Sequence, residues 1–521
     1  MKKMDRRRFL GTTAAASALA LPAVRALAQN TSTPATLTLH PDQSGPTLPS
    51  NYIGLSYEIE QLSDPSFFSA ANTGLIEQFR ALSPNGVLRL GGNTSDVGWW
   101  KATPDSAQPP LPSNVVLQTP KGERSPMDLA YAVTPEAVRN LRAFLDATGW
   151  TCLYGINLGS STPARAADEA EFVHKTLGSK LEYFQVGNEP DGFGSRFRDK
   201  ATWNADKYFD DWLAAANAIR ARVHSARFGM PDVASHVTWF PTIADRLAAM
   251  RVSDCPCDLD PHAACSCVVA PNAPPVRPTV VTLSHHYYFT GPPSNPRANI
   301  NDLLHPDPKV TNNAAIARDA AQKLGTHYRM TEGNSCYRGG KPGFSDVFAA
   351  TLWSADYALL LASLGYSGVN LHGGSAKQVA NSLGGRLPGD ELIANPNEVH
   401  PRPFYTPIAD IDGKYVAEPT FFGLRFAGHF AGGTMVPLTF SPGAVNATAY
   451  AAKLPTGQTV VAIINKDETQ PLHIDLSGYS VGRVLTAPSL TSRTVEDREA
   501  GGNHEASTVP PATAMLLYSS R

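Results

Sequence analysis

The sequence is poor in charged residues and in cysteine, and it has no long apolar run after its first 28 residues. Asp, Glu, Lys and Arg make up 17% of the 521 residues and hydrophobic residues 42%, which excludes a disordered chain and a coiled coil. No Gly-x-Gly-x-x-Gly motif follows the first predicted strand, which argues against a doubly wound dinucleotide-binding sheet. We therefore expect a globular protein large enough for two domains.

The first 28 residues are expected to be an export signal. Residues 5–10 (DRRRFL) resemble a twin-arginine signal, and an uncharged stretch and a small-x-small site at 26–28 (ALA) follow. The alternative is a membrane anchor, but the uncharged stretch, 9–24, is shorter than the roughly 20 apolar residues that a span needs. The sequence thus predicts removal of 1–28 and a periplasmic or secreted protein.

A bulk excess of positive charge is also absent. After residue 28 the chain carries 38 Lys and Arg against 45 Asp and Glu, a net charge near −7. Nucleic acid is therefore not an expected partner, although a local basic groove stays compatible with this balance.

The six cysteines are unevenly distributed. Four of them fall within thirteen residues around His262, and in an exported protein two local disulfides are the expected reading, with a zinc site as the alternative. Their pairing stays open. The four are Cys255, Cys257, Cys265 and Cys267.

Strand-like and helical runs alternate between residues 51 and 421. Eight βα units in this length predict a (β/α)₈ barrel with loop insertions, an α/β fold. The eight predicted strands are 51–58, 86–90, 151–157, 181–186, 226–230, 280–285, 326–330 and 368–371.

From residue 422 to 521 the helical period stops and short strands follow one another, which predicts a C-terminal antiparallel β-sandwich. The segment 29–50 contains an alternating strand, 35–40, that is expected to pair with this sandwich. We expect the sandwich to brace the barrel rather than to bind carbohydrate.

Two glutamates directly follow predicted strands of the barrel. Glu189 follows the fourth strand and Glu332 the seventh, and reactive groups of such barrels lie at the C-terminal ends of the strands. The alternative is that both carboxylates form ordinary salt bridges.

Four segments carry a resemblance to a known family. Asn188-Glu189-Pro190 resembles the retaining glycoside hydrolases of clan A. The finer resemblance is to glycoside hydrolase family 79, which holds β-glucuronidases and heparanases, and it covers nearly all of residues 35–521. Its segments are 55–58 (LSYE), 88–96 (LRLGGNTSD), 282–288 (TLSHHYY) and 332–340 (EGNSCYRGG).

The resemblance implies a role for each matching residue. Glu189 would be the acid/base and Glu332 the nucleophile, and the anionic nucleophile would raise the pKa of Glu189. Asn188 would bind the sugar 2-hydroxyl, Tyr287 would orient Glu332 through its phenol, and His285 would help to fix that geometry. This mechanism needs no metal and no cofactor.

The same resemblance places the C6 carboxylate of glucuronate against Tyr337 and the backbone amides near Gly339. Arg338 departs from the family pattern, where glycine is expected, and we expect its side chain to point to solvent. Five further polar residues are expected at or near the sugar: Asn93 and Asp96 after the second strand, Glu58 at the end of the first, and His372 and Tyr405 as pocket walls. Glu60 shares a strand face with Glu58, so which of these two glutamates faces the barrel mouth stays open.

Two other features stay open. Arg89 lies within a strand and is expected to be paired, where it could hold a catalytic carboxylate. Trp99 and Trp100 could stack on sugar rings, although buried aromatic side chains are the more common explanation.

The expected function is that of an exo-acting retaining β-glucuronidase, with glucuronides or glycans that contain glucuronic acid as substrates. The alternatives are a heparanase-like endo-β-glucuronidase, a clan A hydrolase for a neutral sugar and a noncatalytic glycan-binding barrel. A binding protein gains little from two close carboxylates that repel each other, which favours an enzyme.

Overall fold

The computed structural model describes residues 34–119, 121, 124–234, 236–252, 276–383, 403–411, 413–500 and 507–519. The export signal expected at 1–28 lies outside these residues, as do the four clustered cysteines, so the predictions made for them stay predictions.

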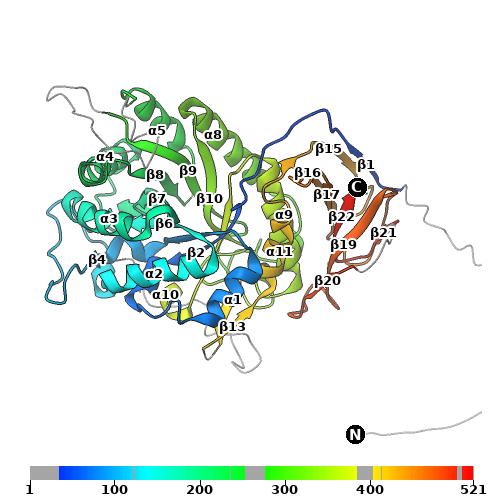
Figure 1. The fold of residues 1–521 in the computed structure, drawn as a ribbon, viewed down its shortest axis with the longest axis horizontal. Helices are drawn as coiled ribbons and strands as arrows, with labels where there is room; N and C mark the ends of the chain where they lie inside the picture. The colour runs from blue at the N-terminus through cyan, green and yellow to red at the C-terminus, as the bar shows by residue number, and fades with distance from the viewer. Residues whose placement is uncertain are drawn as a thin grey trace, which may run out of the picture. The chain divides into compact units, whose positions relative to one another are not determined.

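Eight parallel strands form a closed barrel, which confirms the predicted α/β fold class. Going around the barrel the order is β10-β11-β2-β3-β6-β7-β8-β9, so each strand lies beside its neighbours in chain order (Figure 1). The barrel strands are β2 (Ile53–Glu58), β3 (Val87–Gly91), β6 (Thr151–Ile156), β7 (Leu181–Val186), β8 (Arg227–Val233), β9 (Thr279–Tyr288), β10 (His327–Asn334) and β11 (Val369–Gly373).

Helices connect the strands and cover the outside of the barrel (Figure 1). Two of them begin with the same sequence: Thr134 and Thr162 each cap a helix with their hydroxyl oxygen, and proline follows at the first helical position. No helix in the described part of the chain is long and apolar enough to cross a membrane. The helices are α1 (Thr73–Leu82), α2 (Pro135–Thr148), α3 (Pro163–Leu177), α4 (Ala205–Arg222), α5 (Trp239–Ala248), α7 (Ile300–Leu303), α8 (Pro308–Leu324), α9 (Phe348–Ser363), α10 (Ala376–Ser382) and α11 (Pro419–Gly428).

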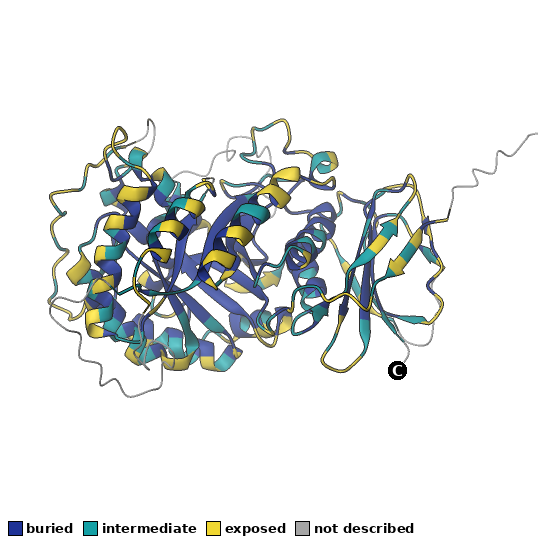
Figure 2. Ribbon diagram, turned by 90° about the horizontal axis from the view of Figure 1, so that it is seen from above, coloured by how far each residue is buried: buried dark blue, intermediate teal, exposed yellow. Residues whose placement is uncertain are grey.

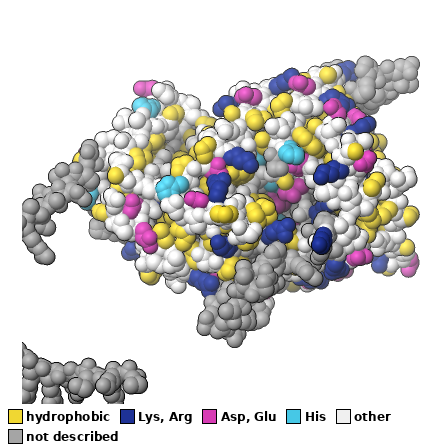
Figure 3. Space-filling view, turned by 180° about the vertical axis from the view of Figure 1, so that it is seen from behind, with side chains coloured by type: hydrophobic (Ala, Val, Ile, Leu, Met, Phe, Trp, Pro, Cys, Tyr) yellow, Lys and Arg dark blue, Asp and Glu magenta, His cyan; other side chains and the backbone are white. Residues whose placement is uncertain are grey.

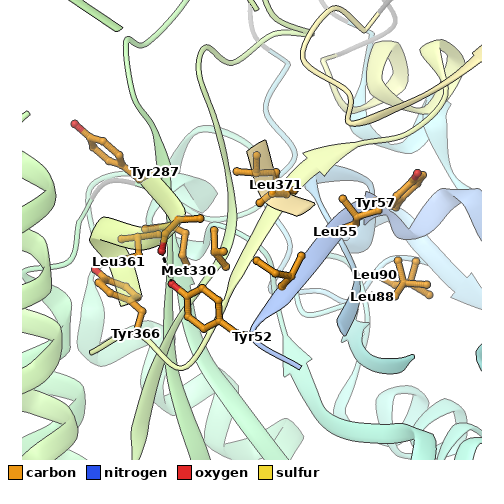
Figure 4. Close-up of a cluster of buried hydrophobic side chains, with 14 of the residues drawn as sticks. Tyr52, Leu55, Tyr57, Leu88, Leu90, Tyr287, Met330, Leu361, Tyr366 and Leu371 are labelled. Atoms are coloured by element: carbon orange, nitrogen blue, oxygen red, sulfur yellow. Dashed lines mark hydrogen bonds between the residues drawn. The ribbon is translucent and has the colours of Figure 1, made fainter. Parts of the chain in front are cut away.

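The barrel strands are buried on both faces, whereas the helices are exposed on their outer sides (Figure 2). Leu55 of β2 and Leu371 of β11 are register partners and lie in one apolar cluster with Met330 (Figure 4). Tyr52 belongs to the same cluster, and its phenol donates a hydrogen bond of 2.7 Å to the carbonyl of Ala358 in α9. The interior of the barrel is therefore a packed apolar core.

The C-terminal strands form an antiparallel sheet of six strands, in the order β14-β16-β17-β22-β19-β20. Two small ladders, β1-β15 and β18-β21, belong with it to a second apolar cluster. These strands are β1 (Thr36–Leu39), β14 (Thr434–Met435), β15 (Leu438–Ser441), β16 (Ala447–Lys453), β17 (Thr459–Asn465), β18 (Leu472–His473), β19 (Tyr479–Thr486), β20 (Glu496–Glu499), β21 (Thr508–Val509) and β22 (Thr513–Ser519).

Alternate side chains of β16 pack on opposite faces of the six-stranded sheet. Ala449 and Ala451 belong to the cluster with the small ladders, whereas Tyr450 and Ala452 belong to the barrel's cluster. The layer of small ladders and the six-stranded sheet make up the antiparallel sandwich.

A single aspartate joins the sandwich to helix α9. Asp356 accepts hydrogen bonds of 2.7 Å from both the Thr448 hydroxyl and the Tyr450 phenol, and it forms an ion pair of 2.5 Å with Lys466. The Lys466 side chain is 1% exposed, so this pair is sealed within the interface. These contacts fit a sandwich that braces the barrel.

Candidate active site

A pocket of about 530 Å³ opens at the C-terminal ends of the barrel strands. Figure 3 shows acidic side chains in a hollow of this face, with basic side chains on either side. The pocket is lined by residues from at least six strand ends and loops, among them Glu58, Asn93, Glu189, Arg196, Tyr287, Tyr288, Lys309, Glu332, Tyr337, Arg338, His372 and Tyr405.

Glu189 lies in the turn that follows β7, in a strained backbone conformation. Its φ of 46° is in the left-handed region, which a side chain other than glycine rarely adopts. Its amide donates to the carbonyl of Asp232 at 3.0 Å, which holds the turn in place. This conformation fixes the direction in which the Glu189 carboxylate leaves the chain.

Glu332 lies near the end of β10, where the pairing with β9 is irregular. Met330 pairs with His285, but Glu332 pairs with His286, so one extra residue, Thr331, bulges between them. Oε1 of Glu332 accepts a hydrogen bond from the Tyr288 phenol at 2.8 Å, and Oε2 accepts one from Nη1 of Arg89 at 2.6 Å. The bulge thus aims the carboxylate at these two donors.

The two glutamates lie close together. An oxygen of Glu189 and an oxygen of Glu332 are within 4.8 Å of each other. Carboxyl groups about 5 Å apart are typical of retaining glycosidases, whereas inverting enzymes need about 6.5–9.5 Å to admit a water.

The surroundings separate the pKa values of the two carboxyl groups. Burial alone would raise the pKa of Glu332, but the positive charges of His372, His286 and Arg89 lower it to about 2. Burial raises the pKa of Glu189, the charge of Glu332 adds to this rise, and the hydrogen bond from His286 opposes it. Glu332 is therefore held as an anion, and Glu189 holds a proton more readily than an ordinary glutamate.

Arg89 is the cation at the centre of this network. It is 1% exposed, and besides Glu332 it donates to Oδ2 of Asp232 at 2.5 Å and to Oδ1 of Asn188 at 2.7 Å. Burial alone would lower its pKa, but the charges of Asp232 and Glu332 raise it. The prediction that Arg89 is paired is confirmed, and one of its partners is Glu332, the residue expected to be the nucleophile.

His286 lies between three carboxylates, and together with Glu189 and Glu332 it makes the one cluster of possible metal ligands among the described residues. Nδ1 is 2.9 Å from Oε1 of Glu189 and Nε2 is 3.2 Å from Oδ1 of Asp232. Burial would lower its pKa, but Asp232 and Glu332 raise it to about 10. A protonated imidazole has no lone pair to offer, so His286 would have to lose its proton before it could bind a metal ion.

Two predicted roles are wrong by one residue along β9. The phenol that reaches Glu332 belongs to Tyr288, whereas Tyr287 donates to Oδ2 of Asp307 at 2.7 Å. Tyr287 still lines the pocket, but it does not orient the carboxylate.

The same shift applies to the histidines of β9. His285 is buried away from the pocket, where Nε2 lies 2.8 Å from the Tyr366 phenol and the ring packs edge-on against Phe240 of α5. Burial lowers its pKa to about 4. His286 is the histidine that reaches the glutamates, because successive side chains of a strand point to opposite faces.

Asn188, Asn93 and Asp96 line a smaller cavity that adjoins Glu189. Nδ2 of Asn188 lies 3.3 Å from Oδ1 of Asn93, which also lines the main pocket. Asp96 is 1% exposed, and its carboxylate accepts from the backbone amides of Leu158, Gly159 and Asn188. Asp96 therefore positions the chain around Asn188 rather than offering its oxygens to a sugar.

Glu58, and not Glu60, lines the main pocket. Its Oε2 accepts from the amide and hydroxyl of Thr94, and its Oε1 lies 3.5 Å from Nε2 of His372. A Cβ at position 92 would lie 2.1 Å from the Glu58 carboxylate, and Gly92 also has a φ of 76°, so this position requires glycine.

The loop expected to recognise a carboxylate also lies at the pocket. Tyr337 lines it, and Arg338, Gly339 and Gly340 all have φ between 58° and 80°. The Gly339 carbonyl accepts from the amide of Phe404, which ties this loop to the one that carries Tyr405, another lining residue. Arg338 is exposed at the pocket rim and adopts the left-handed conformation that glycine would favour.

The sequence reasoning missed three residues of the site, Asp232, His286 and Tyr288. Asp232 carried a usable signal, because it is a carboxylate within the fifth strand of the barrel. It accepts from Nε2 of Gln185 at 2.7 Å and from the Thr331 hydroxyl, in addition to Arg89.

Two proteins named β-glucuronidase are similar to this chain in sequence. The one from Aspergillus niger is 25% identical over 328 residues, which are 60% of this chain and 55% of that protein. The one from Neurospora crassa is 25% identical over 368 residues, 65% of this chain and 60% of that protein. The chain thus spans somewhat more than half the length of these curated relatives, and no family model matches it.

Solved structures extend the likeness to the whole fold. A 4-O-α-L-rhamnosyl-β-D-glucuronidase from Fusarium oxysporum has a TM-score of 0.62 at 16% identity, covering 93% of this chain and all of that one. A GH51 arabinofuranosidase from Xanthomonas axonopodis has a TM-score of 0.61 at 15% identity, covering 94% of this chain and all of that one. The barrel with its C-terminal sheet is therefore a fold that known glycosidases share.

Proposed function

We propose that this protein is a retaining exo-β-glucuronidase of the family 79 type. The observation that carries the proposal is the pair Glu189 and Glu332, whose oxygens lie within 4.8 Å and whose pKa values are shifted in opposite directions. The two fungal relatives named β-glucuronidase support the choice of substrate.

In the first step the Glu332 carboxylate attacks the anomeric carbon while the bond to the leaving oxygen breaks. The proton of Glu189 passes to that oxygen, so the aglycone leaves as a neutral alcohol. Once its charge is lost in the ester, Glu332 no longer raises the pKa of Glu189. Glu189 then takes a proton from water, the water attacks the same carbon, and glucuronic acid leaves with Glu332 restored.

Selection for glucuronate rests on the residues around the rest of the pocket. Three basic side chains line it, Arg196, Lys309 and Arg338, and their positive charge favours an acidic sugar. Tyr337 and the backbone amide of Gly339 are the proposed donors to the C6 carboxylate. We propose exo action because the net charge near −7 after residue 28 argues against a long cationic cleft for sulfated chains.

Export through a twin-arginine pathway is a further part of the proposal, supported by residues 5–10. Replacement of Arg6 and Arg7 by lysine should leave the protein in the cytoplasm, whereas Lys2→Gln should not. Export of the double variant at the normal level would contradict this part.

The test compares hydrolysis of p-nitrophenyl β-glucuronide and β-glucoside by the wild type and Glu332→Gln. We expect strong preference for the glucuronide and loss of turnover in the variant. Equal or faster turnover of the glucoside would overturn the choice of glucuronate while leaving the two-glutamate chemistry intact. Turnover of neither substrate would instead favour endo action or binding, which longer acidic glycans would then distinguish.

A further inference from the structure

A second cavity lies apart from the catalytic pocket. It opens beside the short strand β4 (Gly98–Trp100), has a volume of about 140 Å³ and shares no lining residue with that pocket. Since each water takes about 30 Å³ of the liquid, the cavity has room for roughly five waters. Its walls come from β4, from the loop that follows it and from α3, and they include Trp99, Trp100, Gln108, Leu111, Asn157, Arg165, Asp168 and Glu169.

The wall of this cavity contains Glu169, a buried carboxyl group that forms no ion pair with any residue that the structure describes. Glu169 is 8% exposed, and its Oε1 accepts from the Tyr154 phenol at 2.9 Å. Among the described residues Glu169 has no ion pair, and burial raises its pKa to about 7. The neighbouring Asp168 is instead paired with Arg222. The wall thus combines the Glu169 carboxyl, whose oxygens can accept hydrogen bonds from hydroxyl groups, with one cation, Arg165, which donates to the carbonyl of Pro110.

The apolar part of the cavity is held rigidly. Trp99 and Trp100 are both partly exposed, and the Trp100 ring packs against Phe172 of α3 with centroids 5.1 Å apart. Strand β4 pairs with β5 (Tyr131–Val133), which fixes the backbone that carries the two indoles. The exposed face of an indole can pack against the C–H face of a sugar ring.

The loop beside the cavity is unusually apolar for an exposed segment. Of the five large hydrophobic side chains exposed in the described chain, Leu111, Val116 and Leu117 lie in this loop. Backbone hydrogen bonds of 3.0 Å tie Val116 to Phe197 and Gln118 to Arg196. Because Arg196 also lines the catalytic pocket, the loop leads from the second cavity to that pocket's rim.

We propose that this second cavity is a binding site for a neutral sugar ring of a glycan chain. The indoles cover the apolar face of the ring, and the Glu169 carboxyl, the Asn157 amide and the Gln108 amide bind its hydroxyl groups. The site would hold the neutral part of a glycan at a distance from the catalytic pocket. The proposal does not depend on the reaction at Glu189 and Glu332.

The test is affinity electrophoresis of the full chain in native gels that contain soluble galactan, xylan, glucan or mannan. We expect at least one polymer to retard the wild type, and Trp99→Ala/Trp100→Ala to bind it about tenfold more weakly. A second variant, Gln108→Ala/Leu111→Ala, changes only exposed residues at the rim of the cavity. Its binding of the polymer tests the proposal if the tryptophan variant does not fold. Val416→Ala, at an exposed apolar side chain elsewhere, is the matched control.

Turnover of p-nitrophenyl β-glucuronide, which has no glycan chain, should stay within about twofold of the wild type in the rim variant. Failure of all four polymers to retard the wild type would overturn the proposal, as would equal retardation of both variants. Loss of p-nitrophenyl turnover in the rim variant would also overturn it, because the cavity would then serve the catalytic pocket. The binding result stands whether or not the glucuronide is hydrolysed, so it is separable from the proposed function.

Discussion

Arg89 and Glu332 form a buried ion pair of 2.6 Å, with side chains 1% and 7% exposed. The pair links the second strand of the barrel with the seventh, and Arg89 reaches Asp232 of the fifth strand as well. Arg89 therefore holds the carboxylate that is proposed to attack the sugar, and with His372 and His286 it keeps that carboxylate ionised.

Removing this cation should destabilise the fold. Arg89→Met leaves Asp232 and Glu332 as buried charges without their partner, and we expect a loss of about 3–5 kcal/mol in the free energy of unfolding. Lys175→Met, which breaks an exposed pair with Glu171, should lower the free energy of unfolding far less. Urea unfolding of both variants measures the difference, and equal losses would contradict the central place given to Arg89.

Tyr287 and Tyr288 are adjacent, so the same substitution can be compared at the two positions. Tyr288→Phe removes the hydrogen bond to Glu332 and should lower kcat/KM by about 10- to 100-fold. Tyr287→Phe removes only the bond to Asp307, so we expect kcat/KM within about threefold and a loss of about 1 kcal/mol in unfolding free energy. If Tyr287→Phe were the more damaging change for catalysis, the assignment of Tyr288 would be wrong.

The sequence could predict much of this site, because a strand-end rule places Glu189 and Glu332 in one barrel mouth whatever the packing details. It could not predict which of the alternate residues of β9 face the pocket. Leu283 to Tyr287 are buried without a break, so hydrophobicity does not show which alternate residues face the pocket. The family resemblance alone chose Tyr287 and His285, and each was wrong by one position.

Other parts depend on contacts between distant segments. The link between Asp96 and the amides of Leu158 and Gly159 joins two loops about 60 residues apart, and no local pattern shows it. Asp232 likewise acquires its role only when the closed barrel brings it to Arg89 and His286.

The pH dependence of kcat/KM should respond to His372. Burial would lower its pKa, but Glu332 and Glu58 raise it, and its positive charge in turn lowers the pKa of Glu332. Because the reaction needs Glu332 as an anion, activity is lost as the pH falls through the pKa of about 2. His372→Gln removes the charge, so this acid limb should move to higher pH.

A pH profile of p-nitrophenyl β-glucuronide hydrolysis measures this shift, with the exposed His305→Gln as the control. An acid limb that stays in place, or that moves downward in His372→Gln, would contradict the electrostatic role of His372.

Glu189→Ala tests whether Glu189 is the general acid, through substrates whose leaving groups differ in their need for a proton. Methyl β-glucuronide needs protonation of its leaving oxygen far more than p-nitrophenyl β-glucuronide does, so the variant should lose about 10²–10⁴-fold more activity on the methyl substrate. Added azide, which attacks without a general base, should restore release of p-nitrophenol and form β-glucuronyl azide. Equal losses on both substrates, with no effect of azide, would show that Glu189 is not the acid/base.

The most direct test of the central claim is covalent trapping with 2-deoxy-2-fluoro-β-D-glucuronyl fluoride, followed by mass spectrometry of the intact and digested protein. The account predicts one adduct per chain, located on Glu332, and none in Glu332→Gln. An adduct on Glu189, or hydrolysis of a glucuronide with inversion of the anomeric centre, would contradict it.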